Sequence, residues 1–410
     1  MTRPPRAVVA RSSPLRGRYL VHNRKWNAFL NVADRVIGAF VRAQPAAPSR
    51  EPGRVLLAVG GHLGDAVIAT AAVSLLKRAL PDVEIGMVLG SWATPAIEGH
   101  PDIRWIHTVD HWKSNRSGAS LPRRWLHDRW SRRRALDEIR AVGYDAAVDL
   151  YMYYPNMAGL LWRAGIPTRV GYVSGGYGSL YTHPVEWRDN EHHAAQQQAS
   201  LLGVIVPALA NVGDLRYKLP PVPASARQRA EATLAGVGLT TGDYVVVHMG
   251  AGSPLKEWPA SSWRELVVRL ADEHRLVFTG NGELQQHRAA EVTRDVRQCV
   301  DLIGRLAWPE FVHVLAQARL VLSVDTVAAH VASAVGTPCV ALWAATTRIS
   351  HWRPLGDATV LTNHVSCAPC FRSRGCEAMA CIRGVTADAV LEAVQSRLSS
   401  ARQLQGAACS

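Results

Sequence analysis

Short apolar runs of strand length alternate with helix-length segments in two separate stretches of this 410-residue chain. In the first stretch, the run at 54–59 is followed by glycines and by a helical segment that ends before Pro81. Strands that alternate with helices favour parallel sheets joined by right-handed crossovers. The expected strands lie at 54–59, 83–89, 103–109 and 146–150, and then at 244–248, 276–279, 320–324 and 339–343.

A proline-rich segment at about 207–226 separates the two stretches, as is typical of an interdomain connection. We therefore expect an α/β protein whose two lobes face a central cleft. Ligands of open parallel sheets bind beyond the carboxyl ends of the strands, so the site is expected in that cleft. The expected divisions are an N-terminal extension at 1–53, an N-lobe at 54–215, a C-lobe at 216–385, and a C-terminal helix and tail at 386–410.

The net charge of +13 is unevenly distributed. Residues 1–54 carry eleven Lys and Arg against two acids, and residues 104–140 carry ten against four. Two basic zones favour an anionic partner, such as lipid headgroups, a phosphorylated glycan or nucleic acid, whereas a basic surface that only serves solubility explains the same composition. Nucleic acid is the least favoured partner, because no nucleic-acid-binding module is recognisable in the sequence.

The N-terminal extension contains a segment with helical spacing of apolar residues and basic residues off that stripe. Such a helix lies either on an anionic membrane or with its stripe packed on the body of the protein. No apolar run suits a spanning helix or a secretory signal, so we expect a cytoplasmic protein. The apolar stripe consists of Trp26, Phe29, Leu30, Ala33, Ile37 and Phe40.

The turn after the first strand reads Gly60-Gly61-His62-Leu63-Gly64-Asp65. It matches neither the dinucleotide-binding GxGxxG pattern nor a P-loop. Asp65 falls at the start of a helix, where an N-terminal cap explains an acidic residue. A general base at the mouth of the cleft is the functional alternative.

Three turns of the second stretch carry further candidates. The turn after 244–248 contains Lys256 and small residues before a helix, which suits a phosphate group; a surface loop with a solvated lysine is the alternative. Asp325 and Thr326 stand at another helix start, where capping competes with binding of sugar hydroxyls and phosphate. Glu283 follows a strand at the position where a carboxylate often accepts from ribose hydroxyls.

Taken in order, four segments resemble the heptosyltransferases of lipopolysaccharide core synthesis, glycosyltransferase family 9, over about residues 54–395. These segments are GGHLGDAVIATAAVSLLKRALP, KEWP, TGNGE and SVDTVAAHVASAVGTPCVALW. The resemblance implies a GT-B fold of two Rossmann-like lobes and an inverting transfer that requires no metal or other cofactor. The implied donor is a nucleotide-sugar, with ADP-heptose expected, and the implied acceptor is an anionic glycan or glycolipid of the cell envelope. A peripheral position on the inner face of the inner membrane would suit the two basic zones.

The resemblance also implies roles for individual residues. Asp65 matches the base that deprotonates the acceptor, and His62 and Gly64 fall on the acceptor side. On the donor side, the implied contacts are Lys256 with the diphosphate, Glu283 with the ribose, Asp325 with sugar hydroxyls and Thr326 with phosphate, and the donor loop contains Gly250 and Ser253. Val327 departs from the family, which often has glycine there, and is expected to narrow the donor site. The N-terminal extension and the arginine-rich 111–134 segment are not general family features, so the acceptor stays open.

Four of the seven cysteines lie within fifteen residues, at Cys367, Cys370, Cys376 and Cys381. In a cytosolic protein such a group favours a structural zinc or iron ion over disulfides, with packed free thiols and a redox pair as alternatives. Similar groups occur in part of the family, and the autotransporter heptosyltransferases that resemble it hold iron there. Two alternative functions follow: a protein heptosyltransferase, and a non-enzymatic basic protein that binds nucleic acid or membrane.

Overall fold

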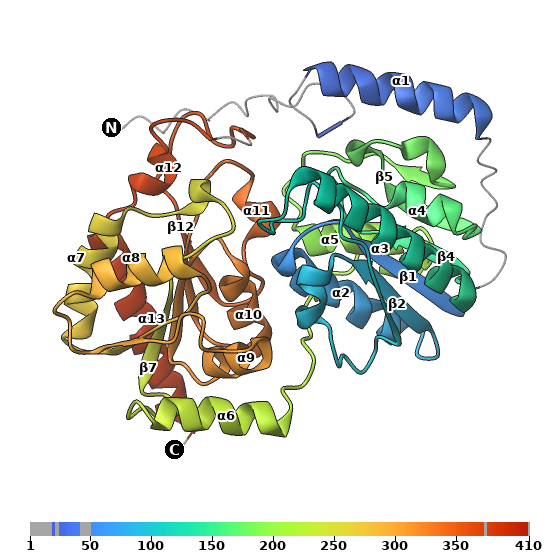
Figure 1. Ribbon diagram of the computed structural model, residues 1–410. Coiled ribbons are helices and arrows are strands. Elements are labelled where there is room, and N and C mark those ends of the chain that lie inside the picture. The colour runs from blue at the N-terminus through green and yellow to red at the C-terminus, as the bar shows by residue number, and fades with distance from the viewer. Residues whose placement is uncertain (1–18, 21–23, 42–50, 373–374, 409–410) are drawn as a thin grey trace, which may run out of the picture.

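The computed structural model describes residues 19–20, 24–41, 51–372 and 375–408, and places two six-stranded sheets side by side (Figure 1). All strand pairs are parallel. The N-lobe strands are β1 (Arg54–Val59), β2 (Glu84–Leu89), β3 (Trp105–Thr108), β4 (Ala146–Asp149), β5 (Thr168–Tyr172) and β6 (His183–Val185). The C-lobe strands are β7 (Tyr244–His248), β8 (Arg275–Phe278), β9 (Cys299–Asp301), β10 (Leu320–Val324), β11 (Cys339–Leu342) and β12 (Ala358–Leu361).

The two sheets have the same connectivity. The N-lobe order is β3-β2-β1-β4-β5-β6, and the C-lobe order is β12-β11-β10-β7-β8-β9, so each lobe reads 3-2-1-4-5-6 from its own first strand. Leu56 of β1 lies opposite Ala147 of β4, and Val246 of β7 lies opposite Val321 of β10. The chain reverses its direction of winding at these two strand pairs, where doubly wound sheets leave a crevice for ligands.

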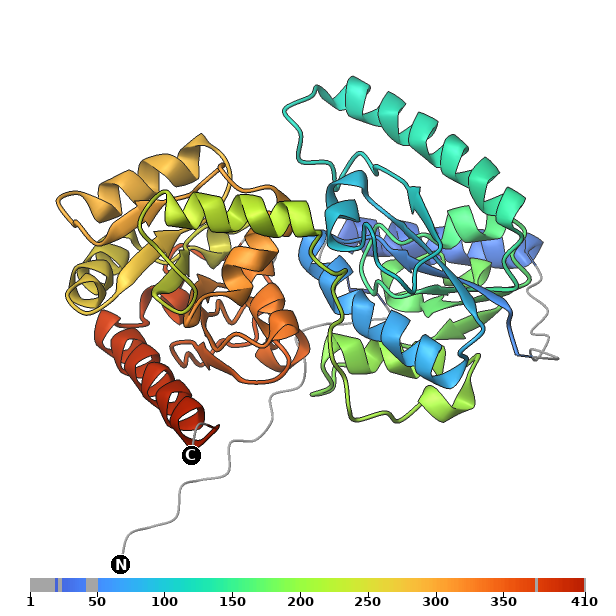
Figure 2. The same ribbon diagram turned by 90° about the horizontal axis from the view of Figure 1, so that it is seen from below.

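Helices cover both faces of each sheet, because side chains along a strand point alternately to opposite faces. In β1, Val55 and Leu57 pack with α2 and α5, whereas Leu56 and Ala58 pack with α3 and α4. Figure 2 shows α2 and α3 on opposite sides of the N-lobe sheet. The N-lobe helices are α2 (Leu63–Ala79), α3 (Leu121–Val142), α4 (Ala158–Arg163) and α5 (Ala194–Leu202), with 3-10 turns at Ser91–Ala96, Val173–Gly175 and Gly178–Leu180.

The C-lobe repeats this arrangement, with α7 and α13 on one face of its sheet and α9 and α10 on the other. One apolar cluster continues from Ile68 of α2 to Val331 of α10, so the lobes share part of their core. The remaining helices are α6 (Ala224–Ala235), α7 (Ala260–Ala271), α8 (Glu283–Thr293), α9 (Trp308–Ala316), α10 (Val327–Val335), α11 (Ile349–Trp352), α12 (Ala380–Arg383) and α13 (Ala387–Ala408), with 3-10 turns at Pro207–Leu209 and Pro254–Lys256.

Helix α1 (Arg24–Phe40) lies along the N-lobe next to α4 and β5 (Figure 1). The Tyr19 hydroxyl donates to the Asp34 carboxylate at 2.7 Å, and Leu30 is fully buried. The predicted amphipathic helix is present. Leu30 and Ile37 pack on the body, as the second alternative required, but Phe29 and Phe40 are exposed.

The α/β class and the two parallel sheets are confirmed, and all eight expected strands are present with ends shifted by at most two residues. The sheets fall within the predicted lobes 54–215 and 216–385, and α13 begins at Ala387, whereas the boundaries themselves stay predictions. None of the helices in the described ranges combines the length and apolarity needed to cross a membrane.

Candidate active site

Loops from both lobes converge on a cavity of 440 Å³, which we call the central cavity. Most of its lining comes from the loops after β1, β4, β7 and β10, the four strands at the two reversal points, and the segments after β3 and β11 complete it. Seven of the predicted site residues line it together: His62, Gly64 and Asp65 from the N-lobe, and Ser253, Lys256, Asp325 and Thr326 from the C-lobe. The central cavity therefore brings the predicted base opposite the predicted phosphate-binding loop.

Asp65 lies in the first turn of α2, whose N-cap is His62. Its carboxylate accepts a hydrogen bond from the His62 backbone N–H at 2.7 Å, so Asp65 supports the cap from the third helical position rather than forming the N-cap itself. Gly61 permits this tight turn, because a Cβ atom there would overlap the Asp65 carboxylate. Asp65 can therefore support the helix start and line the cavity at the same time, so the structural and the functional interpretations of this residue do not exclude each other.

Burial raises the pKa of Asp65 above that of an ordinary carboxyl group, and the negative charge of Asp325 acts in the same direction. The His62 N–H and the positive charge of Lys256 partly oppose this rise in pKa. A carboxylate with a raised pKa is a stronger base than an exposed one. The chemistry that Asp65 supports best is removal of a proton from a group bound in the central cavity.

Asp325 and Lys256 form an ion pair across two C-lobe loops, with 2.9 Å between Lys256 Nζ and Asp325 Oδ2. Burial raises the pKa of Asp325, and the neighbouring Lys256 counters that rise. Lys256 ends a short 3-10 turn whose first residue follows Ser253, and the Ser253 hydroxyl accepts from the Leu255 N–H. The ammonium group is therefore held at the cavity in a position to meet an anionic ligand.

Arg116 is a site residue that the sequence analysis did not single out. It comes from the loop before α3, and its Nη2 lies 3.0 Å from His62 Nε2. Burial, Arg116 and Lys256 lower the pKa of His62 to about 4, so a neutral imidazole accepts from the guanidinium at pH 7. A Cβ atom at Gly252 would overlap the Arg116 guanidinium, so this N-lobe arginine reaches the C-lobe loop. Its only sequence signal was membership of the basic 104–140 zone.

Two more cavities adjoin the central one. The basic cavity, of 820 Å³, lies in the N-lobe and shares His62, Leu63 and Arg116 with the central cavity. Its lining also includes Ser91, Trp92, Asp110, Arg123, Arg124 and His127. The apolar cavity, of 370 Å³, lies on the C-lobe side and shares Gly252, Thr326 and Val327 with the central cavity. Its lining also includes His248, Gly250, Thr279, Gln285, Leu306, Trp308 and Phe311.

Glu283 is the predicted donor residue that the structure does not bring to these cavities. It is the first residue of α8 and is exposed. Gln285, two residues later, lines the apolar cavity, and a Cβ atom at Gly250 would overlap its amide. The role of Glu283 stays a prediction, whereas Gln285 is a lining residue that the sequence analysis missed.

An aromatic group closes part of the central cavity. Tyr151 and Tyr153 follow β4, and Tyr153 stacks on Trp352 of the C-lobe with ring centroids 6.2 Å apart. Burial raises the pKa of both tyrosines well above the usual value, so their hydroxyls stay protonated near neutral pH. The run of aromatic residues directly after the expected strand 146–150 was the available sequence signal.

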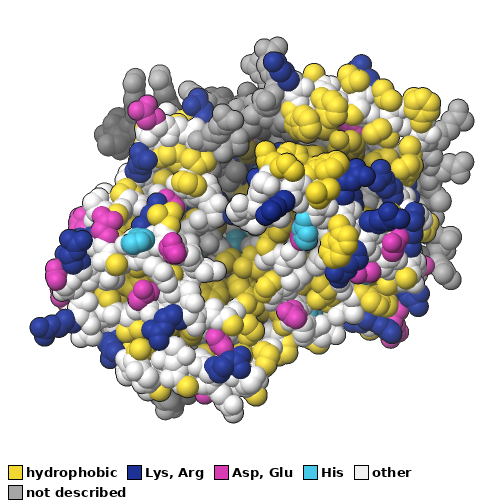
Figure 3. Space-filling model, viewed as in Figure 1, with side chains coloured by type: hydrophobic (Ala, Val, Ile, Leu, Met, Phe, Trp, Pro, Cys, Tyr) yellow, Lys and Arg dark blue, Asp and Glu magenta, His cyan; other side chains and the backbone are white. Residues whose placement is uncertain are grey.

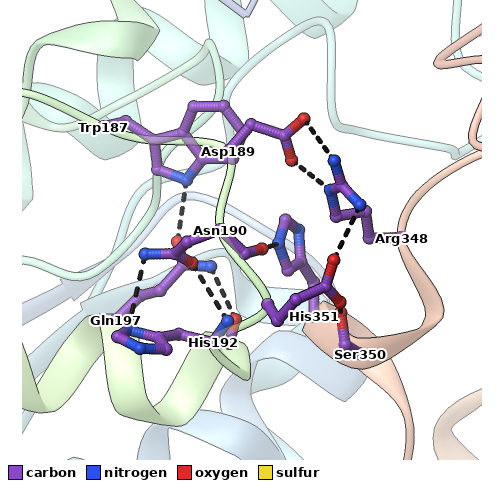
Figure 4. Close-up of polar contacts among 9 residues, drawn as sticks. Trp187, Asp189, Asn190, His192, Gln197, Arg348, Ser350 and His351 are labelled. Carbon is purple, nitrogen blue, oxygen red and sulfur yellow. Dashed lines mark hydrogen bonds and ion pairs between the residues drawn. The ribbon is translucent and has the colours of Figure 1, made fainter. Parts of the chain in front are cut away.

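A polar network joins the lobes at the segment between β6 and α5 (Figure 4). Arg348 of the C-lobe donates to both carboxylate oxygens of Asp189, and also to Glu191 at 2.8 Å. Ser350 donates to Glu191 at 2.8 Å, and His351 lies against the Asn190 carbonyl. A charged pair with two parallel hydrogen bonds fixes orientation as well as distance. The network therefore fixes the position of the N-lobe relative to the C-lobe on this side of the cleft.

The four clustered cysteines differ in environment: Cys381 is buried, Cys370 is intermediate, and Cys367 and Cys376 are exposed. Within the described ranges, no three His, Cys, Asp or Glu side chains are grouped so as to hold a metal ion. The arrangement therefore gives the predicted zinc or iron site no geometric support, and the site stays a prediction. This segment also packs behind the central cavity, since the Phe371 N–H donates to the carbonyl of Thr346, a lining residue.

Comparison with known proteins gives a consistent result. The sequence model of glycosyltransferase family 9 (heptosyltransferase) matches residues 132–380, more than half of the chain. Lipopolysaccharide heptosyltransferase 3 of Escherichia coli is 26% identical over 305 residues, which cover 71% of this chain and 83% of that protein. The glycosyl transferase family 9 structure from Veillonella parvula matches with a TM-score of 0.70 at 18% identity, covering 85% of this chain and 98% of the other.

Two ligand-bound structures are also similar. E. coli heptosyltransferase WaaC with ADP matches with a TM-score of 0.62 at 19% identity, covering 85% of this chain and 99% of WaaC. The dodecameric iron-containing heptosyltransferase TibC, in complex with ADP-D-beta-D-heptose, matches with a TM-score of 0.51 at 13% identity, covering 86% of this chain and 79% of TibC. At these identities the structural matches confirm the GT-B fold alone.

Proposed function

Because this chain belongs to glycosyltransferase family 9, and is thus a glycosyltransferase, we propose that it transfers heptose from ADP-heptose to a glycan of the cell envelope. The acceptor in this proposal is a lipopolysaccharide-core or related glycan, and the transfer takes place in the cytoplasm. One observation carries the proposal: the central cavity holds a carboxylate from the N-lobe opposite a lysine from the C-lobe.

Asp65 acts as the general base in this mechanism. The acceptor hydroxyl oxygen attacks the anomeric carbon of the donor sugar while its proton passes to the Asp65 carboxylate. The bond between the anomeric carbon and the diphosphate oxygen breaks, and ADP leaves with the electron pair. Attack from the side opposite the leaving group inverts the anomeric configuration. The raised pKa of Asp65 suits this step, since a base works best when its pKa approaches the operating pH.

The C-lobe loops stabilise the leaving diphosphate. Negative charge develops on the diphosphate as the bond breaks, and the Lys256 ammonium and the backbone at the start of α10 offer positive charge and N–H donors there. Arg116 reaches the same loop at Gly252 and adds a second cation from the N-lobe. In the donor complex, Lys256 turns to the phosphates and Asp325 accepts from hydroxyls of the sugar. No cofactor takes part in this proposal.

The two adjoining cavities suit the remaining parts of the substrates. The apolar cavity offers Trp308 and Phe311 to the adenine base, and polar groups of Thr279 and Gln285 to the nucleoside. Glu283 is kept as a ribose contact that requires a movement of the first turn of α8. The basic cavity, with Arg116, Arg123 and Arg124, suits an acceptor that carries phosphate or carboxylate groups.

A protein acceptor is the second candidate function. The likeness to TibC and the four clustered cysteines favour it. The likeness to lipopolysaccharide heptosyltransferase 3 and the lower TM-score of TibC favour the glycan acceptor. Transfer of labelled heptose to lipopolysaccharide-core acceptors and to autotransporter passenger domains, measured side by side with the iron and zinc content of the purified protein, distinguishes the two.

Thermal unfolding with a panel of ligands tests the donor: ADP, UDP, GDP, CMP and their sugar conjugates, including ADP-heptose. A ligand that binds only the folded state at one hundred times its Kd adds about 2.7 kcal/mol of stability. We expect ADP and ADP-heptose to raise the Tm and the other nucleotides to leave it unchanged. Stabilisation by another nucleotide alone would reject ADP-heptose as donor, and no response from folded protein would reject the C-lobe site.

A further inference from the structure

Helix α1 carries two apolar ridges, and only one of them is used by the fold. Leu30 and Ile37 face the body of the N-lobe, together with Asp34, which accepts from Tyr19. A second ridge is exposed and consists of Phe29, Val32, Val36 and Phe40, with 49%, 60%, 52% and 86% of each side chain exposed. Spacings of three, four and four residues place these four side chains within an arc of about 80° on a helix. The exposed ridge is therefore continuous along the length of α1.

The exposed ridge continues onto the neighbouring surface of the N-lobe. A groove of 520 Å³ is lined by Val36 and Phe40 of the ridge, by Trp162 and Arg163 of α4, and by Arg132 of α3. Trp162 is 42% exposed. Figure 3 shows hydrophobic side chains gathered along the upper edge of the N-lobe, over α1, with Lys and Arg side chains beside them. A patch of this kind, with apolar and aromatic residues next to cations, marks an interaction site.

The charges around the exposed ridge are positive. Lys25 and Arg35 are exposed on α1, and Arg163 is exposed at the end of α4. Residues 1–18 lie outside the described residues, but their sequence contains five arginines and no acidic residue. An amphipathic helix with lysine and arginine beside its apolar face is typical of segments that lie in the headgroup layer of an anionic bilayer.

We propose that the exposed ridge of α1, with Trp162 and Arg163, docks the enzyme onto an anionic lipid bilayer. Phe29, Val32, Val36 and Phe40 enter the boundary between headgroups and acyl chains, and Arg35 and Arg163 meet lipid phosphates. The docking stands on residues outside the cleft and is independent of the proposed function. Only its consequence, that the bilayer presents a lipid-anchored acceptor, rests on the proposed function.

The same surface is a poorer match for a second copy of this chain. In a two-fold dimer a patch near the axis faces its own copy. Lys25 and Arg35 would then lie close to the same residues of the other copy, and these like charges would repel each other. An anionic bilayer satisfies the apolar ridge and the positive charges together.

Co-sedimentation of the full-length protein with vesicles tests the docking. The vesicles are phosphatidylcholine with about a third phosphatidylglycerol, and phosphatidylcholine alone. The test variant is Val32→Ser/Phe40→Ser, which removes the two most exposed ridge residues and leaves the buried side of α1 intact. The matched control is Val268→Ser, an exposed valine on α7 of the C-lobe. Light scattering of each protein without lipid gives the oligomeric state.

We expect wild type and Val268→Ser to bind anionic vesicles equally, and the double variant to bind at least about tenfold more weakly. Each cation at the surface contributes about fivefold in affinity, so neutral vesicles and high salt should weaken binding as well. Equal binding by the double variant, or equal binding to neutral vesicles, overturns the proposal. A wild-type dimer that the double variant converts to monomer, with vesicle binding unchanged, assigns the ridge to a second copy instead. Stabilisation by ADP is measured on all three proteins, so that a failed donor site and a failed docking surface are told apart.

Discussion

Asp65 follows the first strand of the N-lobe and Asp325 follows the fourth strand of the C-lobe, in two sheets of the same connectivity. Each follows a strand at its lobe's reversal point, each lines the central cavity, and burial raises the pKa of each. Their partners differ. Asp65 accepts from the His62 backbone N–H of its own turn, whereas Asp325 is ion-paired with Lys256 at 2.9 Å.

This difference shows how one architecture supplies two chemical roles. A carboxylate held by its own backbone keeps a lone pair available for a proton, so it suits a base. A carboxylate paired with a lysine is neutralised and positions that lysine, so it suits binding. In the proposed mechanism, the lobes thus separate the proton acceptor from the stabiliser of the leaving group, which an inverting displacement without a metal requires on opposite sides of the sugar.

The largest expected effect separates the two aspartates directly. Asp65→Asn should lower the turnover number by about 10²–10⁴-fold, the usual contribution of a general base, while ADP still stabilises the protein. Asp325→Asn should act mainly on the KM for the donor. Steady-state kinetics with labelled donor, alongside thermal shifts with ADP, measure both. An Asp65→Asn variant that keeps more than about a tenth of the wild-type rate would show that Asp65 is not the base.

Removal of the cation is expected to have the next largest effect. Lys256→Met should lower kcat/KM by about 10²-fold, because it removes charge stabilisation from the leaving diphosphate and a contact to the bound donor. The Kd for ADP should rise in the same variant, which isothermal titration measures. Unchanged ADP affinity would show that Lys256 does not bind the diphosphate, and the proposed division of roles between the two lobes would be rejected.

The network between the lobes should contribute less. Arg348→Met removes the paired hydrogen bonds to the largely buried Asp189 side chain and the contact with Glu191, and hydrogen bonds to charged groups are worth about 1.5–3 kcal/mol. We expect a fall in Tm of about 2 °C and a higher KM with little change in turnover number. Arg348→Lys is the matched control, which keeps the charge and loses the paired geometry. A Tm equal to wild type in Arg348→Met would show that the network does not hold the lobes.

The smallest expected effect is a shift of the pH–rate profile. The direction of this shift should differ between variants of Lys256 and variants of Asp325. The rate should fall on the acid side as Asp65 is protonated, and burial places that fall above the ordinary pKa of an aspartate. Lys256 lowers the pKa of Asp65, so Lys256→Met should move the acid limb to higher pH. Asp325 raises it, so Asp325→Asn should move the limb to lower pH. Shifts of kcat/KM limbs in the same direction for both variants would contradict this electrostatic arrangement.

The sequence predicted the apolar strands well and several short strands with polar residues poorly. Strands β1, β2, β7 and β10 read as continuous apolar runs because both faces of a parallel sheet are covered. Strands β5, β6, β9 and β12 were not expected, since they have three to five residues and carry polar or proline residues. Such short strands form only by pairing with an existing sheet, and no local sequence pattern predicts that pairing.

The candidate site was predictable where chemistry sits in a turn after a strong strand. Asp65, Lys256 and Asp325 all follow such strands, so their convergence could be expected from the sheet topology. Arg116 and Gln285 could not be singled out, because each side chain occupies space that a glycine distant in sequence leaves open. These glycines are Gly252 for Arg116 and Gly250 for Gln285. The double ridge of α1 was likewise hidden, because a helix pattern does not tell which apolar side chains the body will cover.

Arg116 lines the basic cavity and the central cavity at once. In the proposed function these cavities are the acceptor and donor sites, so a side chain that both substrates contact links their occupancies, and linkage is reciprocal. The factor by which bound donor changes the affinity for acceptor equals the factor by which bound acceptor changes the affinity for donor. The order in which the two substrates arrive then alters the path to the ternary complex but not its free energy. Because the Arg116 guanidinium reaches across to Gly252, the measured affinity for one substrate should depend on whether the other is bound.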